Sequence, residues 1–414
     1  MYNSANNLKN KTMKPLQKKC LNYNLPQLLK KKGLYPFYHP LESGQDTEVT
    51  IKGEKVLMFG SNSYLGLTNH PELIMAAQKA VRKYGTGASG SRLMNGNLDL
   101  HVELEEQLAA FVNKPDATVF STGFQTNLGV ISSLVGRNDY IIIDEKDHAS
   151  ILDACRLSFA KILKFRHNDM ESLEKVLQRT NPNNITLIIV DGVFSMGGDV
   201  APLDKITELA EEYNASVMVD DAHALGVLGK NGAGTASHYN LEDKTDLIMG
   251  TFSKSLASLG GFIAGSKETV NYIKHNARSL LFSASIPPAS AATVLKALEI
   301  IKAEPERLQN LWENTNYAKK RLKEEGFNIG HSTTPIIPIF IGNDLNTFKY
   351  ASMLLEAGVY VNPVVHPAVA KGEAILRFSL MATHSKDQID FAVEVLVRCK
   401  NLIEKNDFLL QNVL

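Results

Sequence analysis

The chain has 414 residues, 44% of them apolar, and its 44 basic residues balance its 44 acidic ones. This length predicts about two or three domains with a large core, and the balanced charge argues against nucleic acid as the main partner. The three cysteines, Cys20, Cys155 and Cys399, form no disulfide framework or zinc motif, which is typical of a reducing compartment. We find neither an apolar run of about 18 residues nor a signal-peptide core, and therefore expect a cytoplasmic protein.

Residues 1–33 hold eight lysines and no acidic residue, which leaves 36 basic against 44 acidic residues in the remainder. We expect a loose arm around one short helix here, and we assign residues 1–55 to an N-terminal arm and segment. A strand that runs into a turn follows at 56–66, and helices are predicted at 71–84 and 99–112. The glycine-rich stretch 85–91 lacks the ending of a phosphate loop and follows a helix, so it is interpreted as a close-packed turn.

Short runs rich in Ile and Val alternate with helix-length segments from residue 117 onward. This is the pattern of a mostly parallel sheet that is buried on both faces, and it predicts an α/β large domain over residues 56–295. Ligands in such sheets bind outside the carboxyl ends of the strands. The runs are 117–120, 140–143, 185–190, 216–219 and 246–251.

Chemically useful side chains follow these runs. Gly123 opens a helix whose free N–H groups and dipole can hold a phosphate. His148 follows the second run, and Asp220 and His223 follow the fourth. Lys254 follows the fifth run, between two serines, where burial would lower the pKa of its amine and make it a nucleophile.

Each of these residues also has an ordinary structural role when taken alone. Lys254 can be a surface lysine in a polar turn, Asp220 can cap a helix, His223 can be a core histidine and His148 can begin a helix. Their convergence on one sheet edge favours a site instead. The set meets the needs of pyridoxal phosphate: an amine for its aldehyde, a buried carboxylate for its ring nitrogen, a ring-stacking partner and donors for its phosphate.

The last third of the chain predicts a smaller α+β domain over residues 296–414. Long helices extend from about 286 to 325, three strand-like runs follow at 336–341, 358–361 and 374–380, and a last helix is expected at about 386–403. We expect the two domains to dock tightly, because no flexible linker separates them.

Five segments resemble the α-oxoamine synthases, and the resemblance extends from about residue 35 to 397. The family consists of homodimers that depend on pyridoxal phosphate, join an amino acid to an acyl-CoA and release CO₂. The resemblance implies a PLP-dependent transferase of fold type I, with a seven-stranded sheet in the large domain and a smaller C-terminal domain. The segments are Gly250–Gly261, Asp220–Gly226, Gly60–Leu67, Gly85–Arg92 and Asp147–Ser150.

The resemblance implies roles for the cofactor-binding residues. Lys254 corresponds to the Schiff-base lysine, and Asp220 to the partner of the pyridine nitrogen. His223 and Ser195 correspond to donors to the phenolic oxygen, and His148 to the residue stacked on the ring. The phosphate contacts correspond to Gly123, Phe124, Thr251 and Ser253, with Ser283 reaching in from the other subunit.

The resemblance also implies a substrate site and a reaction. Arg377 corresponds to the arginine that holds the substrate carboxylate, and His148 helps to hold the amino acid. Asn62, or Ser63 in the alternative register, meets the amino acid. Further segments, among them 46–49, 136–140 and 377–384, resemble members that condense L-serine with palmitoyl-CoA. The expected products are 3-ketodihydrosphingosine, CoA and CO₂, the first step of sphingolipid synthesis, and no metal is expected.

Three alternatives stay open. Glycine C-acetyltransferase and 8-amino-7-oxononanoate synthase share the family, because substrate choice depends on pocket shape. A non-catalytic partner subunit would share only the fold, and the presence of Lys254, Asp220 and His148 argues against it. The basic arm has two interpretations: a solvated chain end, or peripheral contact with an anionic inner membrane surface that attracts lysines.

Overall fold

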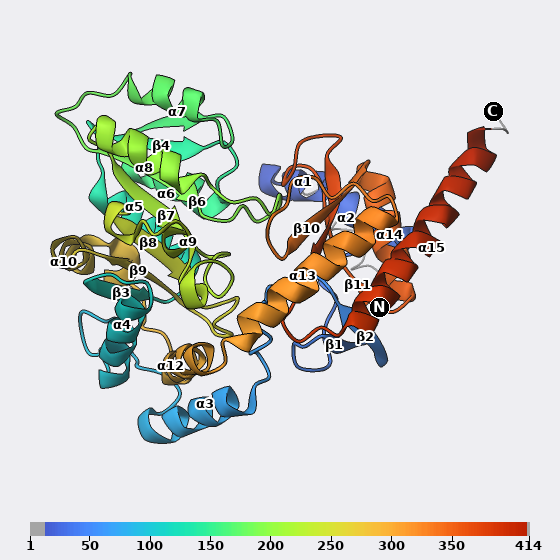
Figure 1. The fold of residues 1–414 in the computed structure, drawn as a ribbon, viewed down its shortest axis with the longest axis horizontal. Coiled ribbons are helices and arrows are strands. Elements are labelled where there is room, and N and C mark those ends of the chain that lie inside the picture. Colours follow the sequence, from blue (N-terminus) through green and yellow to red (C-terminus); the bar gives the residue numbers. More distant parts are fainter. Residues whose placement is uncertain (1–12, 412–414) are drawn as a thin grey trace, which may run out of the picture.

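A seven-stranded sheet forms the centre of the larger of two lobes (Figure 1). Five of its strands pair in parallel, and β9 (Gly261–Gly265) is antiparallel to both of its neighbours. The predicted α/β fold with a mostly parallel sheet is therefore confirmed. In the computed structural model, which describes residues 13–411, the strands lie in the order β3 (Asp116–Phe120), β9, β8 (Leu247–Thr251), β7 (Ser216–Asp220), β6 (Thr186–Asp191), β4 (Tyr140–Asp144) and β5 (Lys161–Phe165).

Two strands of this sheet were not predicted. β5 lies at the edge and keeps exposed lysines between its apolar residues, so its sequence lacks the continuous apolar run of a buried strand. β9 contains a glycine at each end and only three larger residues, which makes its apolar run too short to stand out.

Both faces of the sheet are covered by helices, which explains the unbroken apolar runs. Ile141 and Ile143 pack into one apolar cluster and Ile142 into the other, because side chains of a strand alternate between the faces. One face is covered by α5 (Gly123–Leu134), α6 (Ala149–Ser158), α10 (Lys267–Asn276) and α11 (Arg278–Leu281). The other face meets α4 (Asp99–Phe111), α7 (Met170–Leu177), α8 (Leu203–Glu212), α9 (Thr235–Tyr239) and α12 (Pro288–Ala303), and the short turns η1 (Lys230–Gly232) and η2 (Glu242–Lys244) complete this lobe.

The smaller lobe contains two three-stranded sheets. The first has the order β10 (Ile336–Gly342), β13 (Ala374–Ser379), β12 (Asn362–Val364) and is antiparallel. The second joins β1 (Glu48–Ile51) and β2 (Glu54–Met58) to β11 (Val359–Tyr360), which pairs in parallel with β2. The expected boundary at residue 56 therefore falls inside a strand, and β12 was not predicted because its three residues include a proline.

Long helices connect and cover the lobes. α12 packs against α3 (Pro71–Tyr84) and leads into α13 (Glu306–Glu324), and the expected boundary at residue 296 falls within α12. α14 (Asp344–Glu356) and α15 (Lys386–Gln411) complete the smaller lobe (Figure 1). α15 is longer than the predicted 386–403.

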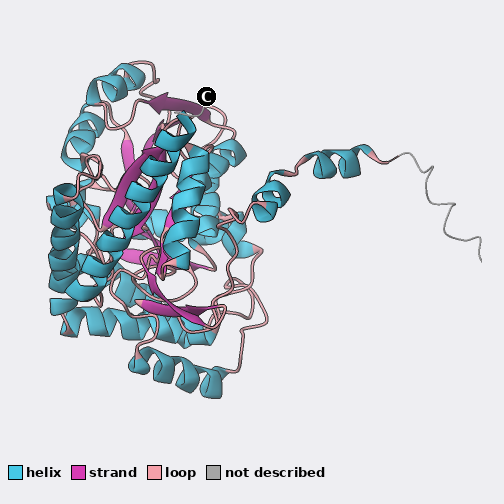
Figure 2. Cartoon of the chain, turned by 90° about the vertical axis from the view of Figure 1, so that its right-hand side faces the viewer, coloured by secondary structure: helices cyan, strands magenta, loops and turns pink. Residues whose placement is uncertain are grey.

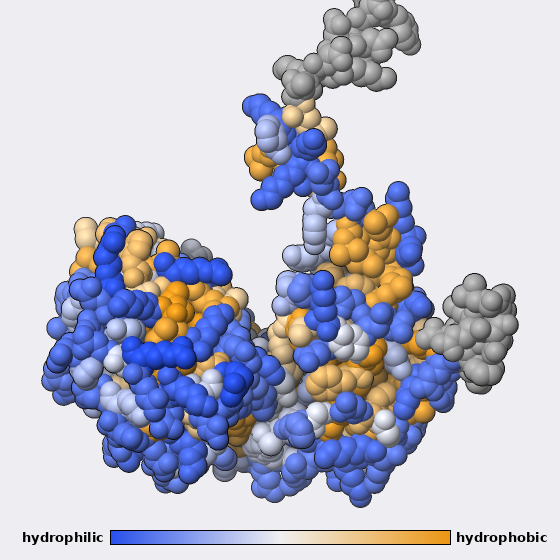
Figure 3. All heavy atoms as spheres, turned by 90° about the horizontal axis from the view of Figure 1, so that it is seen from above, coloured by the Kyte–Doolittle hydropathy of each residue, from blue (hydrophilic) through white to orange (hydrophobic). Residues whose placement is uncertain are grey.

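The described part of the basic arm, residues 13–33, projects from the body (Figure 2). It contains two short helices, α1 (Pro15–Asn22) and α2 (Leu25–Lys31), where one was predicted. No side chain of α1 is buried, and only Leu29 of α2 is. Figure 3 shows the arm as a mixture of polar and apolar surface standing away from the two lobes. Across the described part of the chain, helices that are both long and apolar enough to cross a bilayer are absent.

Phe59, directly after β2, joins the two sheets of the smaller lobe. Its ring is fully buried, and its centroid lies 4.3 Å from the rings of both Phe378 and His384, nearly parallel to each. Its carbonyl accepts a hydrogen bond of 2.7 Å from the Ser379 N–H.

We expect Phe59→Ala to lower the free energy of unfolding by about 3–5 kcal/mol, because it leaves a cavity between two stacked rings. Urea unfolding followed by the fluorescence of Trp312, the single tryptophan, would measure this loss. Phe391→Ala is the control, since that ring is 41% exposed. A Phe59→Ala effect no larger than that of the control would contradict the packing role.

Candidate active site

The predicted site residues meet at the carboxyl edge of the large sheet. Asp191, Asp220 and Thr251 end the neighbouring strands β6, β7 and β8, so backbone pairing fixes their spacing. His148 begins α6 directly beyond β4. Lys254 follows β8 by three residues. The convergence inferred from the order of strands is thus present in space.

Asp220 is buried and held by two donors. Asn127 Nδ2 donates to Asp220 Oδ2 at 2.7 Å, and the Ala222 N–H donates to Oδ1 at 3.0 Å. Asn127 also donates to Ser150 Oγ at 2.9 Å. These contacts keep the carboxylate in a fixed orientation. Asn127 was missed in the sequence, where its only signal is its place one helical turn after Gly123.

Lys254 is partly buried among charges of both signs. Burial lowers the pKa of its amine to about 8, against the opposing effect of Asp220 and Asp191, whose negative charges raise it. Arg377 acts in the same direction as burial. A lysine with this pKa is neutral in a substantial fraction of molecules near pH 8, as a nucleophile or a base must be.

Asp191 is a further buried acid in this group that the sequence analysis did not assign. Burial and the neighbouring Asp220 raise the pKa of its carboxyl well above the ordinary range. Its Oδ2 accepts the His148 backbone N–H at 3.0 Å. Asp191 therefore positions the start of α6.

His148 has the ordinary role of a helix cap, and its predicted role beside the cofactor ring stays a prediction. Its Nδ1 accepts from the Ser150 N–H at 3.3 Å and contacts Ser150 Oγ at 2.8 Å, so the side chain caps α6. Part of the residue is open to solvent while the imidazole is partly covered by the protein, and Asp220 and Lys254 both act on it electrostatically. Burial lowers the pKa of the imidazole, with Lys254 adding to this and Asp220 opposing it. A capped, neutral ring is thus fixed in direction beside the acid and the amine.

Gly123 packs so closely against Thr251 that a side chain at position 123 would collide with the threonine. A Cβ at Gly123 would lie 2.8 Å from Thr251 Oγ1, and the first N–H groups of α5 are free at this end of the helix. Thr251 Oγ1 contacts Ser253 Oγ at 3.0 Å. Phe124, also predicted to contribute an N–H, occupies the first turn of α5. Helix dipole, N–H groups and two hydroxyls together suit an anion such as a phosphate.

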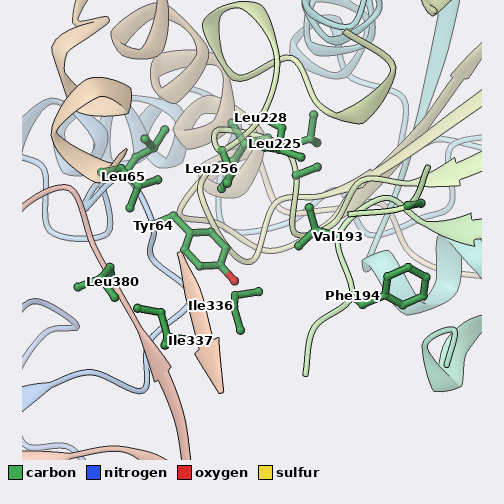
Figure 4. Packing of buried hydrophobic residues seen from close by; sticks show 14 of the residues in the cluster. Tyr64, Leu65, Val193, Phe194, Leu225, Leu228, Leu256, Ile336, Ile337 and Leu380 are labelled. Atoms are coloured by element: carbon green, nitrogen blue, oxygen red, sulfur yellow. The ribbon is translucent and has the colours of Figure 1, made fainter. Parts of the chain in front are cut away.

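Tyr64 connects the remaining predicted residues. Its hydroxyl lies 2.7 Å from His223 Nδ1, 3.3 Å from Asn62 Oδ1 and 3.3 Å from Arg377 Nη2, which donates to it. The ring is buried between the lobes, near Leu65 and Leu256 and facing Ile336 (Figure 4). Tyr64 lies within a segment that carried the family resemblance, but no role had been assigned to it.

Arg377 is buried and oriented by three acceptors. Its Nε donates to the Ser195 carbonyl at 2.6 Å, its Nη1 to Ser379 Oγ at 2.9 Å and its Nη2 to the Tyr64 hydroxyl. A guanidinium has five N–H groups, so two remain to hold a carboxylate. Burial, followed by the charges of Lys254 and Arg377, lowers the pKa of His223 well below its ordinary value.

The structure distinguishes the two registers for the amino-acid contact. Ser63 is buried, and its hydroxyl lies 2.8 Å from Thr68 Oγ1. Asn62 instead shares Tyr64 with His223 and Arg377. The geometry therefore favours Asn62.

Ser283 lies beside the anion site of its own chain. Its Oγ accepts a hydrogen bond of 3.3 Å from Gln125 Nε2, in the first turn of α5. The neighbouring Ser285 N–H donates to the Gly90 carbonyl at 3.0 Å. The predicted contact of Ser283 with the other subunit stays a prediction.

Comparison with known proteins gives the family. The sequence profile described as aminotransferase class I and II matches residues 54–396. This chain belongs to that family. The serine palmitoyltransferase of Sphingobacterium spiritivorum is 58% identical over 383 residues, which cover 92% of this chain and 96% of the relative. The predicted membership of the α-oxoamine synthases is confirmed.

Two further relatives extend the comparison. The 8-amino-7-oxononanoate synthase 1 of Bacillus subtilis is 46% identical over 356 residues, covering 86% of this chain and 91% of the relative. A solved structure of a lysine-to-alanine variant of the S. paucimobilis serine palmitoyltransferase, with a bound PLP–myriocin aldimine, has a TM-score of 0.91 and 34% identity. The match covers 95% of this chain and all of that one, which confirms the fold-type-I assignment.

We expect Lys254 in cofactor-free protein to react with a neutral acylating reagent with a midpoint near pH 8, because only the unprotonated amine is nucleophilic and its pKa is about 8. Mass spectrometry of the Lys254 peptide across a pH series would give the midpoint. Asp220→Asn should move this midpoint to lower pH, since Asp220 raises the pKa of Lys254. A wild-type midpoint near the value of about 10.4 for an exposed lysine would contradict this description.

Proposed function

We propose that this protein is a pyridoxal phosphate-dependent serine palmitoyltransferase that converts L-serine and palmitoyl-CoA to 3-ketodihydrosphingosine, CoA and CO₂. The observation that carries the proposal is the meeting of the Lys254 amine, the Asp220 carboxylate and the Arg377 guanidinium at one sheet edge. The identity of 58% with a serine palmitoyltransferase supports the choice of substrates.

The residues present fit pyridoxal phosphate. Gly123, Thr251 and Ser253 would hold its phosphate, where the steric limit at Gly123 leaves N–H groups and hydroxyls facing one space. Asp220 would bind the pyridine nitrogen through a carboxylate already oriented by Asn127. His148 would cover one face of the ring, with Phe124 and Ser195 as further contacts.

When bound, pyridoxal phosphate supplies an aldehyde that exchanges between the lysine and substrate amines, and a pyridinium that withdraws electrons from the substrate Cα. The buried Asp220 carboxylate would keep a proton on the pyridine nitrogen of the bound cofactor. If Tyr64 donates to His223 Nδ1, the His223 Nε2–H is left to donate to the phenolic oxygen. Both interactions favour the electron-withdrawing form of the ring.

Arg377 and Lys254 have different roles toward the amino acid: Arg377 binds its carboxylate and Lys254 removes its Cα proton. The two free N–H groups of Arg377 hold the serine carboxylate. Asn62 contacts the Tyr64 hydroxyl, to which Arg377 also donates, and this places Asn62 beside that carboxylate. This orientation directs the Cα–H toward Lys254, whose amine has a pKa of about 8 and takes that proton at Nζ. The carbon then attacks the thioester of palmitoyl-CoA and releases CoA. The carboxylate leaves as CO₂, and a proton is returned to the carbon in its place.

The proposal is tested by incubating purified protein with serine, glycine or alanine and a series of acyl-CoAs, and measuring CoA release and lipid products. We expect serine with palmitoyl-CoA to give the highest kcat/KM. Arg377→Ala should raise the KM for serine about a hundredfold, because it removes charged hydrogen bonds to the carboxylate, while cofactor content is unchanged. Arg377→Lys is the conservative control.

A preference for glycine or alanine with short acyl-CoAs would favour the glycine C-acetyltransferase or 8-amino-7-oxononanoate synthase alternatives. If serine with palmitoyl-CoA is the preferred pair, the Lys254→Ala variant should show no turnover with these substrates. Purified protein that binds no pyridoxal phosphate and releases no CoA would instead support the non-catalytic partner subunit.

The proposed assembly is a homodimer with its sites at the interface. Two large apolar side chains are exposed beside the anion site: Phe282 at 77% exposure and Phe124, in the first turn of α5, at 43%. Ser283, next to Phe282, would then contact the phosphate of the other subunit. Light scattering should give about twice the chain mass of 45.6 kDa, and a mass equal to one chain at assay concentration would contradict the dimer.

The proposed location is the cytoplasm, with peripheral contact at the inner membrane through the basic arm. α1 and α2 expose Leu16, Leu21, Leu25 and Leu28 beside lysines, and residues 1–33 contain no acid. Lysines near an anionic bilayer contribute about 1 kcal/mol each, and less as salt rises. The long-chain product of the proposed reaction must be transferred to a membrane, and contact of the enzyme with the bilayer would favour this transfer.

We expect the full chain to bind anionic phosphatidylglycerol vesicles at low salt and to release them at high salt. Deletion of residues 1–33 should abolish this binding in a sedimentation assay while activity on dispersed substrates is retained. Neutral phosphatidylcholine vesicles are the control. Equal binding by full-length and truncated protein would show that the arm is only solvated chain.

A further inference from the structure

His167 lies between two carboxylates, outside the residues assigned to the reaction. Its Nδ1 is 3.0 Å from Asp144 Oδ1, and its Nε2 is 2.7 Å from Asp199 Oδ2. Carboxylates accept hydrogen bonds, so both ring nitrogens carry protons and the ring is an imidazolium. Burial alone would lower the pKa of His167, but these two hydrogen bonds overcome it and raise the pKa to about 9.

The first of these carboxylates begins the turn that leads to His148. Asp144 ends β4, and its N–H donates to Asp147 Oδ2 at 3.0 Å. Asp147 Oδ1 accepts the Asp191 N–H at 2.9 Å, and Asp191 Oδ2 accepts the His148 N–H. A fixed Asp144 therefore defines the position of the turn that presents His148.

The second carboxylate closes the turn that carries Ser195. The Phe194 N–H donates to the Asp199 carbonyl at 3.0 Å, and the Gly198 N–H donates to the Phe194 carbonyl at 2.9 Å. Ser195 lies within this turn, and its carbonyl receives the 2.6 Å hydrogen bond from Arg377. A fixed Asp199 thus defines where the Arg377 guanidinium is held.

The packing of Phe194 and the hydrogen bonds of Asn168 also hold Asp144 and Asp199 on either side of His167. The edge of the His167 ring meets the Phe194 ring, with centroids 4.5 Å apart and planes at 86°. Phe194 lies beyond Val193 on the segment that leads away from Tyr64 (Figure 4). Asn168 donates from its backbone to Asp144 Oδ2 and from its side chain to Asp199 Oδ2, each at 2.9 Å.

The positive charge between the two carboxylates belongs to His167 itself. Among residues 13–404, whose side chains the structure describes, the His, Cys, Asp and Glu side chains form no group of three that could hold a metal ion. Within the same range, neither Asp144 nor Asp199 forms an ion pair with a lysine or arginine. The imidazolium is therefore the cation that holds these two acids together.

We propose that His167 is a positioning residue that, as an imidazolium bridging Asp144 and Asp199, sets the spacing between the His148 turn and the Ser195 turn that holds Arg377. The proposal rests on the proposed function, because it concerns the binding of the serine carboxylate. Gly123, Thr251 and Asp220, which would hold the cofactor phosphate and ring nitrogen, lie on other segments. A change in the bridge should therefore alter cofactor affinity less than serine affinity, although His148 and Ser195 also face the cofactor.

The decisive variant is His167→Gln, which removes the charge and leaves two carboxylates facing each other. We expect the dissociation constant for serine, measured by titrating the cofactor absorbance, to rise about tenfold, since charged hydrogen bonds are lost. The pyridoxal phosphate content and the KM for acyl-CoA should change by less than about threefold. His275→Gln is the matched control, because that histidine is exposed on α10 and contacts only the Asn271 carbonyl in the described chain.

A second change distinguishes the bridge from a general loss of stability. In His167→Gln with Asp199→Asn, the glutamine can donate to Asp144 while the new amide donates to the glutamine, so the repulsion between carboxylates disappears. Serine affinity should recover to within about threefold of wild type. If His167→Gln does not fold, Asp199→Ala serves in its place, since it removes one side of the bridge and leaves His167 paired with Asp144.

Three results would overturn the proposal. One is unchanged serine affinity in the folded variant. Another is an equal loss of serine and cofactor affinity that the second change does not restore. If wild-type protein shows no response to serine, the proposed function and the bridge fail together, whereas a normal wild-type response with an unchanged variant removes the bridge alone.

Discussion

The burial of one amine beside two carboxylates is the constraint on which the rest of the site depends. Lys254 keeps a pKa of about 8 because desolvation exceeds the attraction of Asp220 and Asp191. Those acids are fixed by parallel strand pairing rather than by flexible loops. The pKa of Lys254 therefore depends on the pairing of the sheet. A shift of one residue in the register of β6 or β7 would move its acid to the other face of the sheet.

A second group of contacts ties this edge to the smaller lobe. Arg377 lies on β13, and Tyr64 follows the N-terminal strands. The Tyr64 hydroxyl contacts the His223 ring of the large lobe, and Arg377 donates to that hydroxyl. The arrangement places the Arg377 guanidinium on the smaller lobe and the Lys254 amine on the larger one. Geometry at the reacting carbon is thus a property of how the lobes dock.

Much of this could be predicted from the sequence, because the relevant signals lay in local patterns. Apolar runs marked the buried strands, and the residues after each run marked the sheet edge, so Asp220, His148 and Lys254 were found. Asn127, Asp191 and His167 were missed because their roles come from contacts with residues distant in sequence, such as Asp199. β5 was missed because an edge strand keeps polar residues, and the register at Asn62 required the position of the Tyr64 hydroxyl.

The pairing of β2 with β11 has a consequence for synthesis on the ribosome. Leu57 lies opposite Val359, so the hairpin β1–β2 emerges roughly three hundred residues before the strand that completes its sheet. The strands of the large sheet, by contrast, are all complete by Gly265. The larger lobe can begin to fold while the hairpin waits with an unpaired edge and with Phe59 unpacked. Contacts this distant in sequence form slowly, so the smaller lobe is completed late in the folding of each newly synthesised chain.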